Sequence, residues 1–337
     1  MNKSIDFLIL THNAEKFIEK LLLNIFSLKN FNNSIHRIII LDDNSQDKTI
    51  DIVYKVLIKN YILNYKIIIE KNKNGVFYNR ILLLEESKAD YSIFIDDDDL
   101  LENNIIDEFN NVTYKNYDLL FLKRIFCYKN KQINKEEEES INVENLKFVK
   151  YMLNKQTHMY STGIFIKKEI IKNTLNYIDK NEILDIYTFE DVCLTLLFII
   201  LSKTIFTINS NYFYNKTNEN SILTQDNKNK QREDALKIIF LITNIFNKLP
   251  NKLKKNIEYK NFLFLLKLFL IWIVIINIKK IKDIDLIFNI KNKYFIDEEI
   301  NHYIVTNFNF IVWKMINHKF LMFLYFIWKK FFRHKKQ

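Results

Sequence analysis

Over its first hundred residues, the chain alternates short apolar runs with longer segments whose apolar residues recur at helical spacing. Segment 14–28, for example, places Phe17, Leu21 and Ile25 on one face of a helix. The expected strands are 5–10, 38–41, 66–69 and 91–95, and the expected helices are 14–28, 47–59 and 76–87. Strands separated by helices of about 10–15 residues predict an α/β fold with a parallel, doubly wound sheet.

The pattern becomes mixed after residue 116 and helical after residue 231. Strands are expected at 117–122, 125–128, 163–166, 204–208 and 212–214, and helices at 143–153 and 189–201. We therefore expect two parts, an α/β domain over residues 1–227 and a helical C-terminal region over residues 228–337.

Composition narrows the class of protein. The 337 residues include two glycines, Gly75 and Gly163, and one proline, Pro250, which excludes collagen-like, linker-like and proline-rich chains. A hydrophobic fraction of 48% excludes general disorder. The two cysteines predict neither a disulfide framework nor a cysteine-based zinc site.

Charge is distributed unevenly along the chain. The net charge is +10, with 22 Lys/Arg and 8 Asp/Glu in residues 228–337 but 28 and 32 in residues 1–227. A basic C-terminal region indicates an acidic surface, a membrane or nucleic acid as partner, or else solvated helix faces.

Polar clusters follow three of the predicted strands. They are Thr11-His12-Asn13, the segment 42–47 and the four aspartates 96–99. Because the carboxyl ends of parallel strands meet at one sheet edge, where ligands of such folds bind, we expect these clusters to converge. Four aspartates repel one another, and a divalent cation that shares a diphosphate would neutralise them. Alternatively, Asp98 or Asp99 caps a helix near Leu101, and for Asp99 we favour the cap.

These segments resemble the family 2 glycosyltransferases, which have the GT-A fold. The resemblance rests on residues 9–17, 39–49 and 91–99, and extends less clearly over 155–225. It implies a Rossmann-like mixed central sheet with helices on both faces, with a nucleotide-binding half at 1–115 and an acceptor-binding half at 116–227. It also implies a nucleotide-sugar donor, Mn²⁺ or Mg²⁺ as cofactor, and inversion at the anomeric carbon.

By position, the resemblance assigns roles to individual residues. Asp43 matches the residue that binds uracil, and Asp96 and Asp98 match the outer positions of the Asp-x-Asp metal motif, with Asp98 as the direct ligand. Arg80 either serves the diphosphate or holds the aspartates in place. The full set implied to bind the nucleotide is Thr11, His12, Asn13, Asp42, Asp43, Gly75, Arg80, Asp96 and Asp97.

The acceptor side is predicted from residues farther along the chain. Glu190-Asp191, at the start of an apolar helix, resembles the family's Glu-Asp pair, with Asp191 as general base and Glu190 as second choice or orienter. The alternative is a pair of ordinary acids in a helix's first turn. Thr162 and Gly163 resemble the acceptor-binding strand, where Gly163 either admits the sugar or relieves crowding.

Two C-terminal segments bear on localisation. Segment 262–278 is apolar and is expected to be a buried helix rather than a membrane span. Segment 320–337 mixes aromatic residues with lysines, so it either lies on an anionic membrane or packs on its own domain. The N-terminus lacks a signal-peptide pattern, so we expect a cytoplasmic protein. If segment 320–337 lies on the membrane, the protein is peripheral on its inner face.

The combined prediction is a hexosyl- or N-acetylhexosaminyltransferase that extends a capsule, a lipooligosaccharide or a lipid-linked oligosaccharide. Its expected partners are a nucleotide-sugar donor, with a UDP-sugar favoured, and a saccharide or lipid-linked saccharide acceptor, without nucleic acid. The alternatives are a metal-dependent sugar nucleotidyltransferase and a non-catalytic basic protein that binds membrane or nucleic acid. The sequence names neither the sugar nor the linkage.

Overall fold

A computed structural model describes residues 3–128, 131–134, 142–144, 160–218 and 228–251. The chain divides into two compact units, residues 1–263 and 264–337, and the second lies outside the described residues. The predicted apolar segment 262–278 and the basic tail 320–337 therefore also lie outside them. Within the described residues, none of the helices combines the length and the apolar character that spanning a bilayer requires.

The predicted parallel sheet forms the first half of the fold. Strands β1 (Ile5–Thr11), β2 (Ile35–Asp42), β3 (Tyr65–Ile69) and β4 (Tyr91–Asp96) lie in the order β3-β2-β1-β4, and all three pairings are parallel. Every residue of β4 before Asp96 is buried, as expected for a strand covered on both faces.

The second half extends the same sheet and makes it mixed. Strand β9 (Ile164–Lys167) pairs antiparallel with β4 and with β6 (Leu119–Tyr128), and β10 (Thr204–Asn215) runs parallel to β6. The short β5 (Leu100–Leu101) closes the order beside β10, while β7 (Lys131–Asn134) and β8 (Asn142–Glu144) pair with β6 and β10. The expected Rossmann-like mixed sheet is confirmed.

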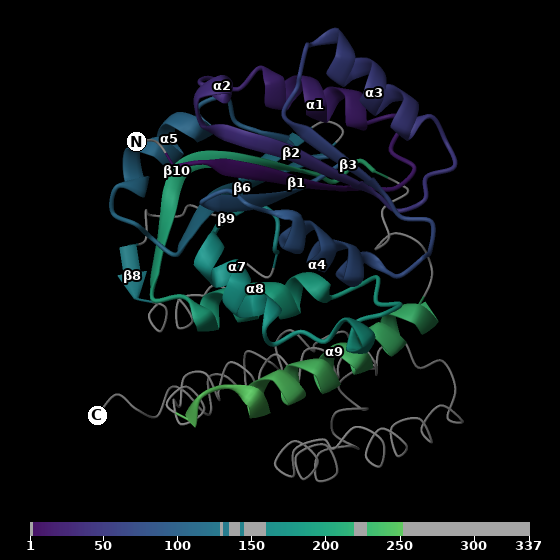
Figure 1. The fold of residues 1–337 in the computed structure, drawn as a ribbon, viewed down its shortest axis with the longest axis vertical. Helices are drawn as coiled ribbons and strands as arrows, with labels where there is room; N and C mark the ends of the chain where they lie inside the picture. Colours follow the sequence, from purple (N-terminus) through teal and green to yellow (C-terminus); the bar gives the residue numbers. More distant parts are fainter. Residues whose placement is uncertain (1–2, 129–130, 135–141, 145–159, 219–227, 252–337) are drawn as a thin grey trace. The chain divides into compact units, whose positions relative to one another are not determined.

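Helices cover both faces of the sheet (Figure 1). Helices α1 (Ile18–Phe26) and α3 (Thr49–Lys59) lie on one face, and α4 (Val76–Glu86), α7 (Lys168–Leu175) and α8 (Glu190–Leu201) lie on the other. The remaining described helices are α2 (Phe31–Ser34), α5 (Ile105–Thr113), the 3-10 turn η1 (Lys180–Glu182) and α9 (Lys228–Lys248).

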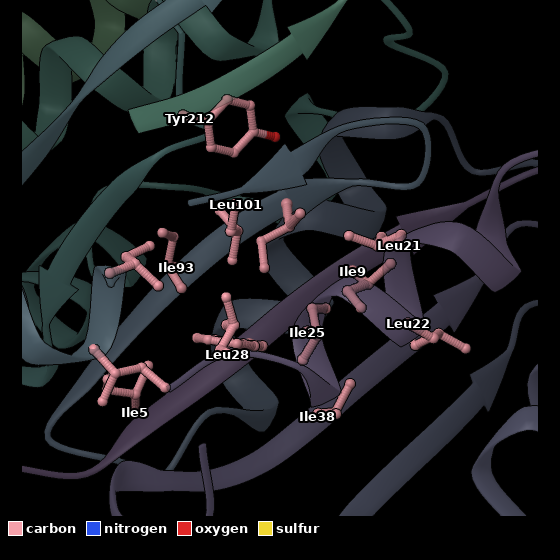
Figure 2. Close-up of a cluster of buried hydrophobic side chains, with 14 of the residues drawn as sticks. Ile5, Ile9, Leu21, Leu22, Ile25, Leu28, Ile38, Ile93, Leu101 and Tyr212 are labelled. Atoms are coloured by element: carbon pink, nitrogen blue, oxygen red, sulfur yellow. The ribbon is translucent and has the colours of Figure 1, made fainter. Parts of the chain in front are cut away.

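The main core lies between α1 and the parallel strands. Ile18, Leu21, Leu22 and Ile25 recur at helical spacing and are all fully or almost fully buried. Figure 2 shows the α1 side chains against strand residues of this cluster, among them Ile5, Ile9, Ile38 and Ile93. Burial of these aliphatic side chains contributes about 1.5–3 kcal/mol each before conformational entropy is counted.

Helix α8 is apolar on all sides because it is buried between the sheet and α9. Cys193, Leu197 and Ile200 of α8 face Ile242 and Ile245 of α9 around a small apolar pocket. Helix α9 thus belongs to the first compact unit, although the sequence suggested a separate region starting at residue 228.

Some local predictions were wrong. Neither Asp98 nor Asp99 caps a helix, because β5 follows directly and α5 starts at Ile105, with Asn104 as its N-cap residue. Strands β6 and β10 each run unbroken where two strands were expected, and β10 absorbs a register shift between Thr207 and Asn211. The helix expected over 143–153 begins inside β8, and the rest of it lies outside the described residues.

Candidate functional site

The polar clusters that follow β1, β2 and β4 lie together at one edge of the sheet, as predicted. In the strand register, Thr11 lies opposite Asp42, and the preceding residue, Leu10, lies opposite Asp96. Strand β1 is the central one of the three, so its polar loop 11–13 lies between the two acidic loops.

Hydrogen bonds tie the loop 11–13 to both acidic loops. The His12 backbone nitrogen donates to Asp97 Oδ2 at 3.2 Å, and His12 Nδ1 lies 2.7 Å from the Asp43 carbonyl oxygen. On the other side, the Asn13 nitrogen donates to Ser45 Oγ at 2.8 Å, and the Gln46 nitrogen donates to Asn13 Oδ1 at 2.8 Å. The three predicted nucleotide-binding segments are therefore one connected surface.

Asp42 and Asp43 are buried carboxylates at this surface. Asp42 Oδ2 accepts a hydrogen bond from the Ser45 nitrogen at 3.0 Å. The Oδ1 atoms of both residues are buried, and neither has a hydrogen-bond partner among the described residues. A buried carboxylate oxygen without a donor is costly, so both residues suit a ligand that brings N–H or O–H groups.

The acidic run 96–99 holds more negative charge than its surroundings neutralise. Burial, with the neighbouring Asp98 carboxylate, raises the pKa of Asp97 to about 8. Burial also raises the pKa of Asp98 to about 6, although the Asn218 amide donates to its Oδ2 at 2.7 Å. A carboxyl pKa raised in this way marks a place where a cation would stabilise the ionised form.

Asp99 differs from the other aspartates of the run because both of its carboxylate oxygens accept hydrogen bonds from β10. The Tyr212 hydroxyl donates to Asp99 Oδ2 at 2.7 Å, and the Asn215 nitrogen donates to Oδ1 at 2.7 Å. The same hydroxyl accepts from the Asp96 nitrogen at 3.1 Å. Asp99 therefore joins the acidic run to β10, instead of capping a helix as the sequence suggested.

Arg80 joins the acidic run to the predicted base. Its Nη2 donates to Asp96 Oδ1 at 3.0 Å, and its Nε donates to Glu190 Oε1 at 3.2 Å. Nη2 also lies 3.7 Å from Asp191 Oδ1. Burial alone would disfavour its charge, but the three carboxylates raise the pKa of Arg80 above its ordinary value. Of the two roles considered for Arg80, the described contacts are those of a residue that holds carboxylates.

Glu190 and Asp191 open α8, as the sequence predicted. Burial, together with the Asp191 carboxylate, raises the pKa of Glu190 to about 8. Asp191 Oδ1 accepts from the Ser161 nitrogen at 3.1 Å and from the Ser161 hydroxyl. Sequence reasoning missed Ser161, and its place one residue before Thr162 was the one available signal.

Arg124 is a second buried cation that sequence reasoning missed. Its Nη2 donates to the Thr162 carbonyl oxygen at 2.7 Å and to Thr162 Oγ1 at 3.0 Å. Its guanidinium carbon lies 4.3 Å from the ring centre of Tyr160 and 4.7 Å from that of Tyr212. The signal that could have found it was a charged residue within the largely apolar run of β6, at a position that proves to be buried.

Both glycines have positive φ angles and tight surroundings. Gly75 (φ +96°) precedes α4, and a Cβ there would lie 2.7 Å from the backbone N and O of Ile186. Gly163 (φ +73°) packs against Tyr212, where a Cβ would lie 3.0 Å from the ring. For Gly163, relief of crowding is thus a sufficient reason for the glycine.

The site gathers most of the predicted residues without forming a complete metal cage. Among the described residues, no three histidine, cysteine or carboxylate side chains are arranged as ligands of a single ion. A Mg²⁺ or Mn²⁺ site that takes one or two carboxylates and completes its coordination with phosphate oxygens does not need such a cage. The raised carboxyl pKa values of Asp97 and Asp98 fit a site of that kind.

Comparisons with known proteins agree with the fold. Crystal structures of S. aureus TarS share the fold. The 1–349 fragment with UDP-GlcNAc has a TM-score of 0.57 and 17% identity over 80% of this chain and 81% of that chain. The fragment with UDP has a TM-score of 0.53 and 17% identity, over 82% and 81% of the two chains. No curated protein sequence matches the chain. The model of glycosyl transferase family 2 matches residues 6–175, which is half of the chain. The chain therefore belongs to glycosyl transferase family 2.

Proposed function

We propose that the protein is an inverting, metal-dependent glycosyltransferase that moves a sugar from a UDP-sugar to a hydroxyl group of a growing surface glycan. The observation that carries the proposal is the double contact of Arg80, which holds Asp96 and Glu190 with one guanidinium. This contact brings the predicted metal-binding run and the Glu190-Asp191 pair into one site, as direct transfer between two substrates requires.

The nucleotide would lie across the loop that follows β1. Asp43 would accept hydrogen bonds from the base and Asp42 from the base or ribose, because each has a buried oxygen without a partner among the described residues. The loop of Thr11, His12 and Asn13 would contact the nucleotide between Asp42 and Asp43 on one side and the run 96–99 on the other. TarS was crystallised with UDP and with UDP-GlcNAc, which supports a UDP-sugar donor and an N-acetylhexosaminyl or hexosyl group.

Asp98, together with Asp96, would hold Mn²⁺ or Mg²⁺. When bound, such an ion stabilises the negative charge that develops on the leaving diphosphate. Arg80 orients Asp96 for this role through the 3.0 Å contact with Oδ1. Asp97 receives the His12 backbone N–H, so it fixes the nucleotide loop beside the metal-binding residues.

Asp191 would act as general base on the acceptor hydroxyl. Ser161 holds one of its oxygens through the backbone nitrogen and the hydroxyl, which orients the carboxylate. Glu190, whose pKa is raised to about 8, accepts a hydrogen bond from Arg80 Nε and so orients the guanidinium. Thr162 and Gly163 would contact the acceptor at the strand beside Ser161. Inversion follows if the hydroxyl attacks from the face opposite the diphosphate.

The acceptor and its location are also part of the proposal. A capsule, a lipooligosaccharide or a lipid-linked oligosaccharide would provide the hydroxyl group. A cytoplasmic enzyme that touches the inner face of the membrane through residues 320–337 would reach a lipid-linked acceptor.

A panel of nucleotide sugars, beginning with UDP-GlcNAc, tests the proposal. We expect one uridine donor to raise the melting temperature in Mn²⁺ and to be hydrolysed or transferred. Asp98→Ala should abolish turnover, whereas Asp51→Asn, on the exposed side of α3, should leave it unchanged. Full turnover by Asp98→Ala, or stabilisation by guanine donors alone, would contradict the assignment of the metal ligand or of Asp43.

A further inference from the structure

Asp234 is a fully buried carboxylate on α9, far along the chain from every residue of the predicted site. Its Oδ2 accepts hydrogen bonds from the backbone nitrogens of Tyr187 (2.9 Å) and Thr188 (3.0 Å) and from Thr188 Oγ1 (3.1 Å). These donors belong to the segment immediately before Glu190. A buried ionised group is kept in a fold only where it is paired, so the contact is a specific attachment of that segment to α9.

Lys230 supplies the opposite charge for this attachment. Its Nζ lies 3.1 Å from Asp234 Oδ1 and 2.8 Å from Asp185 Oδ2. It also donates to the Asp185 carbonyl oxygen at 2.5 Å and lies over the ring of Tyr187, 5.2 Å from its centre. One turn of α9 thus contacts the segment 185–188 from end to end.

The two halves of this segment are anchored differently. The Asp185 nitrogen donates to the Asn74 carbonyl oxygen at 2.7 Å, and the Phe77 nitrogen donates to the Ile186 carbonyl oxygen at 3.1 Å. These bonds tie the first half to the start of α4, the helix that carries Arg80. In the second half, the backbone nitrogens of Tyr187 and Thr188 donate to Asp234, and the Tyr187 hydroxyl donates to the Lys73 carbonyl oxygen at 3.3 Å.

Phe189 lies between the segment that Asp234 holds and the Glu190-Asp191 pair, and it has an unfavourable backbone conformation. Phe189 is the N-cap residue of α8 and has a φ angle of +66°, in the left-handed region. For a bulky side chain this conformation costs about 1–3 kcal/mol, so it persists only where the surrounding structure enforces it. The hydrogen bonds of Asp234 to Tyr187 and Thr188 fix the chain on one side of Phe189, and α8 fixes it on the other.

We propose that Asp234 is a positioning residue for the transfer reaction: it holds Tyr187 and Thr188 so that Glu190 and Asp191 meet Arg80 in the observed geometry. The role of Asp191 in transfer rests on the function proposed above, but the anchoring of the segment does not. The proposal also makes α9 a working part of the catalytic domain, although it lies beyond the residues that the family model matches.

Three variants distinguish the loss of the Asp234 hydrogen bonds from a general loss of stability. Asp234→Ala removes the acceptor, whereas Asp234→Asn keeps one oxygen for the three donors and loses the charge and the acceptor oxygen that face Lys230. Glu233→Ala is the matched control on the same turn of α9, because Glu233 is exposed and contacts only Lys237 among the described residues, at 3.3 Å. Each variant is measured for kcat and donor KM, with the donor that the wild type turns over fastest, and for amide hydrogen exchange of a peptide that spans residues 185–192.

For Asp234→Ala we expect kcat to fall about 10- to 100-fold, as is typical of a misplaced catalytic group, with donor KM within about twofold of wild type. KM is expected to be unchanged because the first half of the segment keeps its own bonds to α4. Exchange of the Tyr187 and Thr188 amides should become faster. Asp234→Asn should keep kcat within about threefold of wild type, and Glu233→Ala should match wild type in every measurement.

Unchanged exchange at residues 187–188 in Asp234→Ala would overturn the anchor, whatever the enzyme does. Faster exchange with unchanged kcat would overturn the positioning role. If Asp234→Ala does not fold, Thr188→Val replaces it, because this change removes one donor and should lower kcat without a change in KM. If the wild type turns over no nucleotide sugar, the proposed function fails, and hydrogen exchange still decides the anchor.

Discussion

Arg80 Nε donates a 3.2 Å hydrogen bond to Glu190 Oε1, although 110 residues separate the two in the chain. The same guanidinium contacts Asp96, at the end of β4, through Nη2. Arg80 is almost fully buried, so both contacts lie in a medium of low polarity, where they are stronger than at the surface. One side chain therefore sets the distance between the predicted metal-binding run and the Glu190-Asp191 pair that includes the predicted general base.

Replacement of Arg80 by lysine should inactivate the enzyme. A lysine keeps the charge but has a single nitrogen, so it cannot contact Asp96 and Glu190 in the same geometry. We expect kcat to fall about 100-fold or more. The fold should lose about 3–5 kcal/mol, because one buried carboxylate is left unpaired. Turnover and urea unfolding measure the two effects, and near-wild-type turnover by Arg80→Lys would contradict the bridging role.

Asp98 and Asp99 are adjacent, yet their replacement should have opposite effects. Asp99→Ala removes the acceptor of the Tyr212 hydroxyl and of the Asn215 nitrogen, and should cost about 1–3 kcal/mol of stability. Asp98→Ala loses only the Asn218 contact among the described hydrogen bonds and should fold normally. Thermal melting with and without Mn²⁺ separates them: Asp99→Ala should keep its shift in Mn²⁺, and Asp98→Ala should not.

The two glycines should differ in their tolerance of alanine. At Gly75 the added Cβ meets backbone atoms of Ile186 at 2.7 Å, and the φ and ψ angles of +96° and 156° are restricted to glycine. At Gly163 the Cβ meets the Tyr212 ring at 3.0 Å, and a ring yields more easily than a backbone. We therefore expect both variants to be destabilised by about 1–3 kcal/mol or more, with Gly75→Ala worse. The opposite order in urea unfolding would contradict the packing described for Gly75.

Acid stability should depend on Asp6, at the opposite end of β1 from the site. Burial opposes its ionisation, but donors from Lys88, Ala89 and His36 outweigh burial, so the pKa of Asp6 is lowered from 3.8. A lowered pKa in the folded state gives stability that is present above the unfolded value, about 4, and is lost as the pH falls through the folded value. Urea unfolding between about pH 6 and pH 3 should show a steeper loss for wild type than for Asp6→Asn. Parallel curves would contradict the account.

Sequence periodicity predicted the strands and the convergence of their polar ends because both depend on local pattern and on a general rule of parallel sheets. The pattern places Thr11, Asp42 and Asp96 at one edge of the sheet, and the strand register confirms this. The family resemblance added Arg80 and the Glu190-Asp191 pair, whose contact through the guanidinium is observed.

The residues that sequence reasoning missed act through contacts between distant segments. Ser161 reaches Asp191, Tyr212 reaches Asp99, and Asp234 reaches Thr188, and none of these pairs has a spacing that local pattern detects. Asp99 was misassigned for the same reason. As a helix cap it needs only the next turn of chain, whereas its actual partners lie more than 110 residues away on β10.

The most direct test of the proposed function compares Asp191→Asn with wild type and with the exposed variant Asp51→Asn, in Mn²⁺ and with the uridine donor that the panel selects. The account predicts that Asp191→Asn binds UDP as wild type does, because only the base is lost. Its rate of transfer or hydrolysis of the donor should fall about 100-fold or more. Asp51→Asn should equal wild type. Turnover by Asp191→Asn at the wild-type rate would contradict the central claim that the group held between Ser161 and Arg80 is the base of a glycosyl transfer.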